Sequence, residues 1–265
     1  MRQREVFPYY RKCCDELERV YEIIQEYYKP GYTDELMALR GYVGEEQRDE
    51  IERSNFGRCI MLPEMLGDMA KELGLLTEGY SFLLDNRYII PVYDVAGRLS
   101  ALIGYYPDAR KYVTTPSPFF SKEVMFFNFN EAYEISYDKY NGAVILVEGI
   151  FDCVSLRALG LPAIATMGAT VSQTKGELLK VFRKVVGVPD NDVTGRKSIN
   201  RYDKRGWKVP STATMVRLHG EMDFGDEKRK IKDCDNIVSW FDADSVREMF
   251  KDLFKMKEDI YDLRL

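Results

Sequence analysis

The chain of 265 residues has little of what several common classes of protein require. It contains one histidine, His219, and its five cysteines form no Cys-x-x-Cys pair, so we expect no zinc site and no histidine-based triad. No apolar run approaches the length of a membrane-spanning helix, and the first residues lack the apolar core of a signal peptide. We therefore expect a cytoplasmic protein with no membrane partner.

An excess of positive charge is also missing. The chain has 38 Lys and Arg against 43 Asp and Glu, a net charge of -5, which argues against a basic coat for nucleic acid over the whole surface. Hydrophobic residues make up 45% and charged residues 31%, as in a folded globular protein. Any chemistry must then depend on carboxylates, lysines, arginines and a hard metal ion.

The pattern of the sequence changes twice along the chain. Residues 1–81 have mainly helical spacing, and short β runs follow from residue 82, with turn residues at 94–97. These runs predict a small antiparallel sheet, in which Pro91 favours a strand edge or end. From residue 143, apolar runs alternate with helical segments up to residue 192, which predicts a parallel sheet flanked by helices.

The predicted organisation is therefore α/β with two parts. Residues 1–138 form a mixed α+β N-terminal subdomain, and residues 139–265 form a domain with a central parallel sheet. After residue 240, an amphipathic stretch predicts a short C-terminal helix. Its apolar stripe consists of Val246, Phe250, Leu253 and Ile260.

Acidic residues follow two of the predicted parallel strands. Glu148 ends the first strand, and Asp190 and Asp192 end the third. The carboxyl ends of parallel strands meet at one edge of the sheet, where ligands bind. Each acid by itself could be a solvated loop residue or a helix cap, but their recurrence beside glycines favours an oxygen-rich site for Mg²⁺ or Mn²⁺.

Three segments resemble the signatures of a TOPRIM domain, namely residues 147–152 (VEGIFD), 167–170 (MGAT) and 189–196 (PDNDVTGR). TOPRIM domains occur in DnaG-type primases, topoisomerases, OLD-family nucleases and RecR proteins. Further segments are similar to those of the DnaG-type primases alone, at residues 86–98, 111–116, 121–132 and 232–236. The chain is thus identified as similar to the RNA polymerase core of a primase.

This resemblance implies a nucleotidyltransferase that makes short RNA primers on single-stranded DNA. It implies two or more Mg²⁺ or Mn²⁺ ions, and five carboxylates that hold them: Glu148, Asp190, Asp192, Asp233 and Asp235. Glu148, Asp190 and Asp192 are the expected catalytic residues. Basic residues are expected to bind nucleotide and DNA phosphates. They are Lys111, Lys122, Arg87, Arg196 and, in place of an arginine that the family has in its usual glycine-rich turn, Arg110.

The expected partners are the single-stranded DNA template, ribonucleoside triphosphates and the RNA primer. Cellular primases of this type also carry zinc-binding and helicase-binding domains, which have no counterpart in the printed sequence. We therefore expect a phage or mobile-element protein, in a bacterial or phage-infected cytoplasm, with a separate replicative helicase and a separate zinc-binding partner. Two alternatives stay open: a TOPRIM-type metal-dependent nuclease, and a catalytically weak DNA-binding accessory protein of a replisome.

Overall fold

The computed structural model describes residues 3–61, 64–77, 82–106, 111–115, 121–199, 207–225 and 227–265. The chain divides into two compact units, residues 1–121 and 122–265, which are described separately as unit 1 and unit 2. Within the described ranges, no helix is long and apolar enough to cross a membrane.

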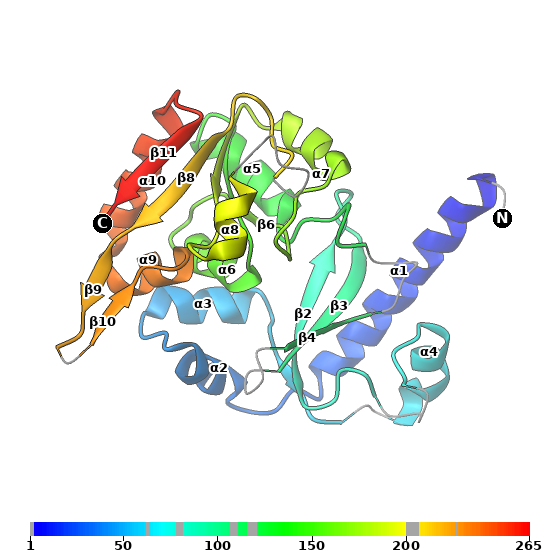
Figure 1. The fold of residues 1–265 in the computed structure, drawn as a ribbon. Helices are drawn as coiled ribbons and strands as arrows, with labels where there is room; N and C mark the ends of the chain where they lie inside the picture. The colour runs from blue at the N-terminus through cyan, green and yellow to red at the C-terminus, as the bar shows by residue number, and fades with distance from the viewer. Residues whose placement is uncertain are drawn as a thin grey trace. The chain divides into compact units, whose positions relative to one another are not determined.

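Unit 1 combines helices with one antiparallel sheet, as predicted (Figure 1). Its elements are α1 (Gln3–Gln25), α2 (Tyr32–Arg40), α3 (Glu45–Arg53), β1 (Arg58–Cys59), the 3-10 helix η1 (Glu64–Leu66), α4 (Gly67–Glu72), β2 (Arg87–Tyr93), β3 (Leu99–Tyr106) and β4 (Lys111–Thr114). The strand order is β1-β2-β3-β4. The predicted turn joins β2 to β3, where Asp94 Oδ1 accepts hydrogen bonds from the amides of Ala96 (2.8 Å) and Arg98 (3.0 Å).

Pro91 does not lie on an edge strand or at a strand end, as the sequence had led us to expect. It lies inside β2, which pairs with both β1 and β3. The sheet accommodates a proline here because β1 is short and pairs only with Arg87 and Tyr88. On the β1 side of β2, the Ile89 amide donates a hydrogen bond to the carbonyl of Gly57. Two residues later, at Pro91, β1 no longer pairs with β2, so the missing amide hydrogen of proline costs no ladder hydrogen bond.

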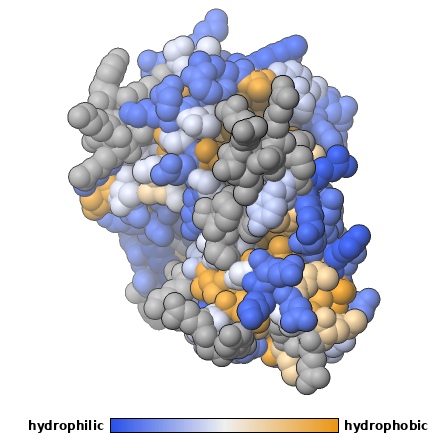
Figure 2. All heavy atoms as spheres, turned by 90° about the vertical axis from the view of Figure 1, so that its right-hand side faces the viewer, coloured by the Kyte–Doolittle hydropathy of each residue, from blue (hydrophilic) through white to orange (hydrophobic). Residues whose placement is uncertain are grey.

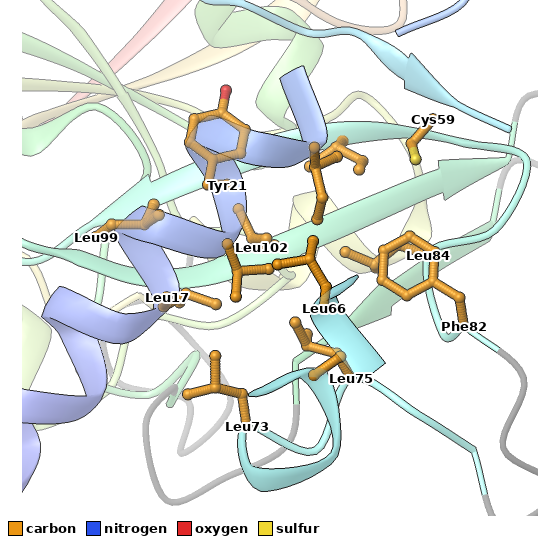
Figure 3. Close-up of a cluster of buried hydrophobic side chains, with 14 of the residues drawn as sticks. Leu17, Tyr21, Cys59, Leu66, Leu73, Leu75, Phe82, Leu84, Leu99 and Leu102 are labelled. Atoms are coloured by element: carbon orange, nitrogen blue, oxygen red, sulfur yellow. The ribbon is translucent and has the colours of Figure 1, made fainter. Parts of the chain in front are cut away.

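The core of unit 1 lies between α1, the sheet and the α4 region (Figure 3). Leu17 and Tyr21 of α1 meet Leu99 and Leu102 of β3 in this cluster. Most of the described surface in Figure 2 is hydrophilic, with apolar areas toward the lower end of the view.

Unit 2 is built on a parallel sheet of five strands in the order β11-β8-β7-β5-β6, flanked by helices, which confirms the predicted fold class (Figure 1). Its elements are α5 (Phe129–Lys139), β5 (Ala143–Val147), α6 (Ile150–Ala158), β6 (Ala163–Ala165), α7 (Gln173–Leu178), η3 (Leu179–Val181), β7 (Lys184–Val188), α8 (Val193–Ser198), β8 (Thr214–His219), the hairpin β9 (Glu221–Asp223) and β10 (Lys228–Lys230), α9 (Cys234–Trp240), α10 (Ala243–Lys255) and β11 (Ile260–Arg264). Val144 and Leu146 of β5 pack with Phe129 of α5, so one face of the sheet lies against that helix.

The C-terminal segment differs from the prediction. Val246, Phe250 and Leu253 are buried along α10, as the amphipathic pattern predicts. Ile260, however, is 40% exposed and begins β11, which pairs in parallel with β8 at the edge of the sheet. The apolar stripe therefore ends with the helix, and the last residues extend the sheet.

The boundary between the compact units also lies earlier than the predicted division between residues 138 and 139. Phe126, Phe129 and Ala132 belong to the apolar core of unit 2. Phe127 forms a bridge with Ala165 at the end of β6. Residues 122–138 thus complete the parallel-sheet unit, because their apolar side chains are buried there.

Candidate functional site: an acidic cluster at the carboxyl edge of the parallel sheet

The carboxyl ends of β5 and β7 bring the predicted acids together. The two strands are neighbours, with Val147 opposite Val188 in register. Glu148 follows β5 at once, and Asp190 and Asp192 follow β7. Each of these acids therefore lies just beyond the carboxyl end of a buried strand.

Glu148 and Asp190 have strongly perturbed acidities. Burial, followed by the negative charge of Asp190, raises the pKa of Glu148 to about 7. Burial, followed by the charge of Asp233, raises the pKa of Asp190 to about 6. The Oε1 atom of Glu148 is buried and accepts no hydrogen bond. This oxygen is therefore buried without a hydrogen-bond donor, an arrangement that costs free energy and is frequent at functional sites.

Two further predicted ligands begin helices. Asp192 Oδ1 accepts hydrogen bonds from the amides of Thr194 and Gly195, both at 2.8 Å, at the start of α8. Asp233 Oδ1 accepts the amide of Asn236 at 2.9 Å at the start of α9. Each carboxylate thus uses one oxygen as a helix cap, a geometry that fixes the backbone beside the cluster.

Asp235 and Asp152 connect α9 to α6. The Asp235 amide donates to Asp152 Oδ1 at 3.0 Å, and Asp235 Oδ1 accepts the hydroxyl of Ser155. Both acids are 8% exposed. Burial, followed by the charge of Asp233, raises the pKa of Asp152 well above its usual range. The structure therefore adds Asp152 to the acidic cluster, while the Ser155 bond turns one oxygen of Asp235 toward α6.

The donor set fits a hard divalent cation by its chemistry, because it consists of carboxylate oxygens and includes the unbonded Oε1 of Glu148. Within the described residues, however, no three Asp, Glu, His or Cys side chains are gathered closely enough to ligate one ion as they stand. Asp192 and Asp233 each use one oxygen in a capping bond, so side-chain rotations would accompany metal binding.

The predicted basic residues are distributed over both units. In unit 1, Arg87 stacks over the ring of Tyr106, with its guanidinium carbon 5.6 Å from the ring centroid. The backbone of Lys111 lies in β4, and Arg110 lies outside the described residues. In unit 2, Lys122 and Arg196 are both exposed, and Arg196 donates to Asn191 Oδ1 at 3.4 Å.

Sequence reasoning missed one cation that belongs to the acidic cluster. Lys232 Nζ lies 3.5 Å from Asp190 Oδ2. Attraction to Asp190 and Asp233 outweighs burial and raises the pKa of Lys232. The sequence signal was present, because Lys232 directly precedes Asp233 in the segment that resembles the primases. Its role was not recognised because residues 190 and 232 meet only in the folded chain.

A second missed residue is the buried lysine of α7. Lys175 is 0% exposed, donates from Nζ to the carbonyl of Thr166 at 2.6 Å, and lies 4.9 Å from the ring centroid of Phe126. Burial, followed by repulsion from Lys122, lowers the pKa of Lys175 to about 7. This lysine holds the start of the turn at residues 166–170, which carries the second TOPRIM-like signature.

The replacement Lys175→Met is expected to change how stability depends on pH. The pKa of Lys175 is about 7 in the folded chain and near 10.5 in the unfolded chain, so the unfolded state holds more protons between these values. The free energy of unfolding should therefore rise with pH above 7, by up to about 1.4 kcal/mol per pH unit, and Lys175→Met should lose this rise. Urea unfolding at pH 7, 8 and 9 tests this through the fluorescence of Trp207 and Trp240, both in unit 2. Parallel pH dependences of the two proteins would contradict it.

Divalent cations are expected to stabilise unit 2 more at high pH than at low pH. Because the folded chain raises the pKa of Glu148 and Asp190, their ionisation makes the metal-free protein less stable as pH rises through about 6 to 7. A divalent ion binds the ionised carboxylates and offsets this loss. The shift in melting temperature on adding Mg²⁺, followed by tryptophan fluorescence, should thus be larger at pH 8 than at pH 5.5. KCl at matched ionic strength is the control, and a shift independent of pH would argue against this site.

Residues 145–228 match the Toprim-like protein family. A DNA primase from Clostridium acetobutylicum is 24% identical over 227 residues, which cover 72% of this chain and 37% of that protein. A DNA primase from Aquifex aeolicus is 35% identical over 126 residues, which cover 45% of this chain and 25% of that protein. The matched part of this chain therefore covers only 25% to 37% of the length of these curated relatives. Both relatives are bacterial and give no support to a phage or mobile-element origin, which stays a prediction.

Solved structures agree with the observed fold. The zinc-binding and RNA polymerase domains of Aquifex aeolicus primase match with a TM-score of 0.67 and 26% identity, over 91% of this chain and 60% of that chain. A DnaG primase catalytic domain bound to single-stranded DNA matches with a TM-score of 0.64 and 18% identity, over 91% of this chain and 80% of that chain. The described architecture is therefore that of a DnaG catalytic core with a TOPRIM domain.

Proposed function

We propose that this chain, which has the fold of the DnaG-type primase core and sequence similarity to DNA primases, is a primase catalytic core. It synthesises short RNA primers from ribonucleoside triphosphates on single-stranded DNA. The observation that carries the proposal is the acidic cluster at the carboxyl edge of the parallel sheet, where, besides burial, the charge of Asp190 raises the pKa of Glu148 and the charge of Asp233 raises the pKa of Asp190. Unit 1, with its antiparallel sheet, supports a primase over other TOPRIM proteins, and the domain assignment of both parts belongs to this proposal.

In this mechanism the acidic residues would hold two or more Mg²⁺ or Mn²⁺ ions. Glu148, Asp190 and Asp192 are the catalytic carboxylates, and Asp233 and Asp235 complete the ligand set. When bound there, divalent ions would activate the primer hydroxyl and neutralise charge on the triphosphate. The carboxylates fix where that chemistry takes place, since the strands β5 and β7 set their positions.

The basic residues orient the anionic partners. Lys122 and Arg196 in unit 2, and Arg87, Lys111 and Arg110 in unit 1, bind phosphates of nucleotide or DNA through charge-assisted hydrogen bonds. Such contacts position the template without reading its sequence. We also propose that the protein acts in the cytoplasm and works with a separate replicative helicase and a separate zinc-binding partner.

A direct assay of synthesis tests the proposal. The protein is incubated with labelled ribonucleotides, single-stranded DNA and Mn²⁺ or Mg²⁺, beside Asp190→Asn. Asp223→Asn is the matched control, because Asp223 is exposed on β9 and its Oδ1 accepts the amide of Gly225, a bond that asparagine can keep. Primers should form with the wild type and with Asp223→Asn, and synthesis should fall at least ~100-fold with Asp190→Asn.

The same assay separates the alternatives. Cleaved DNA without oligoribonucleotides would overturn the proposal in favour of a metal-dependent nuclease. DNA binding with neither product, even with a candidate helicase added, would overturn it in favour of an accessory role in a replisome.

A further inference from the structure

Lys232 is a basic side chain that forms an ion pair with the acidic cluster. Its ammonium lies 3.5 Å from Asp190 Oδ2. Its charge is attracted by Asp190, Asp233 and Asp192, and it acts in turn on Glu148. A single positive charge thus interacts with carboxylates from the loops after β5 and β7 and from the start of α9, as a metal ion at this edge would.

The backbone of Lys232 is held from both sides. Its amide donates to Asn236 Oδ1 at 3.0 Å, and its carbonyl accepts the amide of Asn191 at 2.6 Å. The preceding carbonyl, of Ile231, accepts Asn191 Nδ2 at 3.0 Å. Asn191 lies between Asp190 and Asp192, so these bonds join the segment 190–192 to the segment that begins α9. They hold the backbone of Lys232 beside both.

The side chain itself is not enclosed. Lys232 is 52% exposed, so its flexible four-carbon stem can turn outward while the backbone stays in place. A divalent ion among the same carboxylates would repel the ammonium. A displaced ammonium at this position faces whatever anion approaches the cluster from solvent.

We propose that Lys232 is the resident counter-cation of the acidic site, that a divalent ion displaces it, and that the displaced ammonium binds a phosphate of the incoming triphosphate. The first part depends only on the acidic cluster, whereas the last part rests on the proposed function. Lys232 thereby keeps the carboxylates assembled before metal binding and becomes a nucleotide-binding residue afterwards.

Binding of Mn²⁺ without nucleotide tests the first part. Free Mn²⁺ is measured by electron paramagnetic resonance at low ionic strength and pH 7.5. Lys232→Met should bind Mn²⁺ about tenfold more tightly than the wild type, because a competing charge is removed. Lys232→Arg should resemble the wild type, and so should the control Lys230→Met, which alters an exposed residue of β10.

Equal or weaker Mn²⁺ binding by a Lys232→Met protein with a normal unfolding transition would overturn the proposal. If Lys232→Met does not fold, Lys232→Gln takes its place under the same criterion.

Binding of a non-hydrolysable ribonucleoside triphosphate at saturating Mn²⁺ tests the last part. Lys232→Met should bind it about tenfold more weakly, while Lys232→Arg keeps most of the affinity. These opposite changes in metal and triphosphate affinity would not arise from a purely structural role. If wild type and Lys232→Met bind the triphosphate equally, the phosphate role is overturned and the primase proposal stands. If the wild type binds no triphosphate, the phosphate role and the primase proposal both fail, and the Mn²⁺ result still decides the first part.

Discussion

Replacing Glu148 with glutamine is expected to lower primer synthesis at least ~100-fold and, at the same time, to stabilise the metal-free protein. Activity should fall because the amide cannot supply the negative charge that holds a divalent ion. Stability should rise at pH 8, because the wild type must ionise a carboxyl group whose pKa burial and Asp190 raise to about 7, and glutamine removes that cost. Primer yield and urea unfolding, followed by tryptophan fluorescence, measure the two effects.

The matched control is Glu177→Gln, the same substitution at an exposed acid of α7 in the same unit. It should leave primer synthesis within about twofold of the wild type, as expected for a surface change remote from the site. For Glu148→Gln, activity should fall while stability rises, and this combination distinguishes the loss of the site from misfolding of the protein. An active Glu148→Gln variant, or one that loses activity and stability together, would contradict the role assigned to Glu148.

Replacing Gly195 with alanine is expected to destabilise unit 2 by about 2–3 kcal/mol and to abolish metal binding. A Cβ atom at this position would lie 1.8 Å from the carbonyl oxygen of Asp190, which is backbone and cannot turn aside. The start of α8 would have to move away from the β7 loop. The Gly195 amide, which donates to Asp192 Oδ1 at 2.8 Å, would move with it. Urea unfolding by tryptophan fluorescence and Mn²⁺ titration measure the two losses.

Gly168→Ala is the control for this prediction. Gly168 lies in the turn after β6, and no atom is within 4 Å of the Cβ that alanine would add. The free energy of unfolding should change by less than about 0.5 kcal/mol. If Gly195→Ala were as stable as Gly168→Ala, the close approach of α8 to Asp190 would not exist in solution.

The acidic edge of the sheet could be predicted from sequence because its residues follow continuous apolar strands. A run such as 143–147 has to be buried on both faces, so it belongs in a parallel sheet and its last residue lies at the carboxyl edge. Glu148, Asp190 and Asp192 lie at this edge because they follow such strands. Lys111, Lys122, Arg87, Arg110 and Arg196 were assigned from resemblance to the primases alone, and their roles stay proposals.

Local patterns were insufficient where distant segments decide the structure. The sequence pattern predicts Pro91 at a strand edge or end, yet it is accommodated inside β2 because β1 pairs only with Arg87 and Tyr88. Ile260 continues the apolar spacing of α10, yet pairing with β8 places it in a strand. Residues 122–138 precede the parallel strands in sequence, yet Phe126 and Phe129 complete the core beside them. Each outcome depends on a partner strand or core that a window of sequence does not contain.

The sequence alone thus determined the fold class and which acids follow which strands. Tertiary structure decided the state of those acids. The pKa of Glu148 depends on burial and on Asp190 across the sheet, Asp235 bonds to Ser155 of another helix, and Lys232 reaches Asp190 from a distant segment. The reason is physical: strand periodicity is a local property, whereas desolvation and Coulomb interactions depend on whatever surrounds a charge after folding.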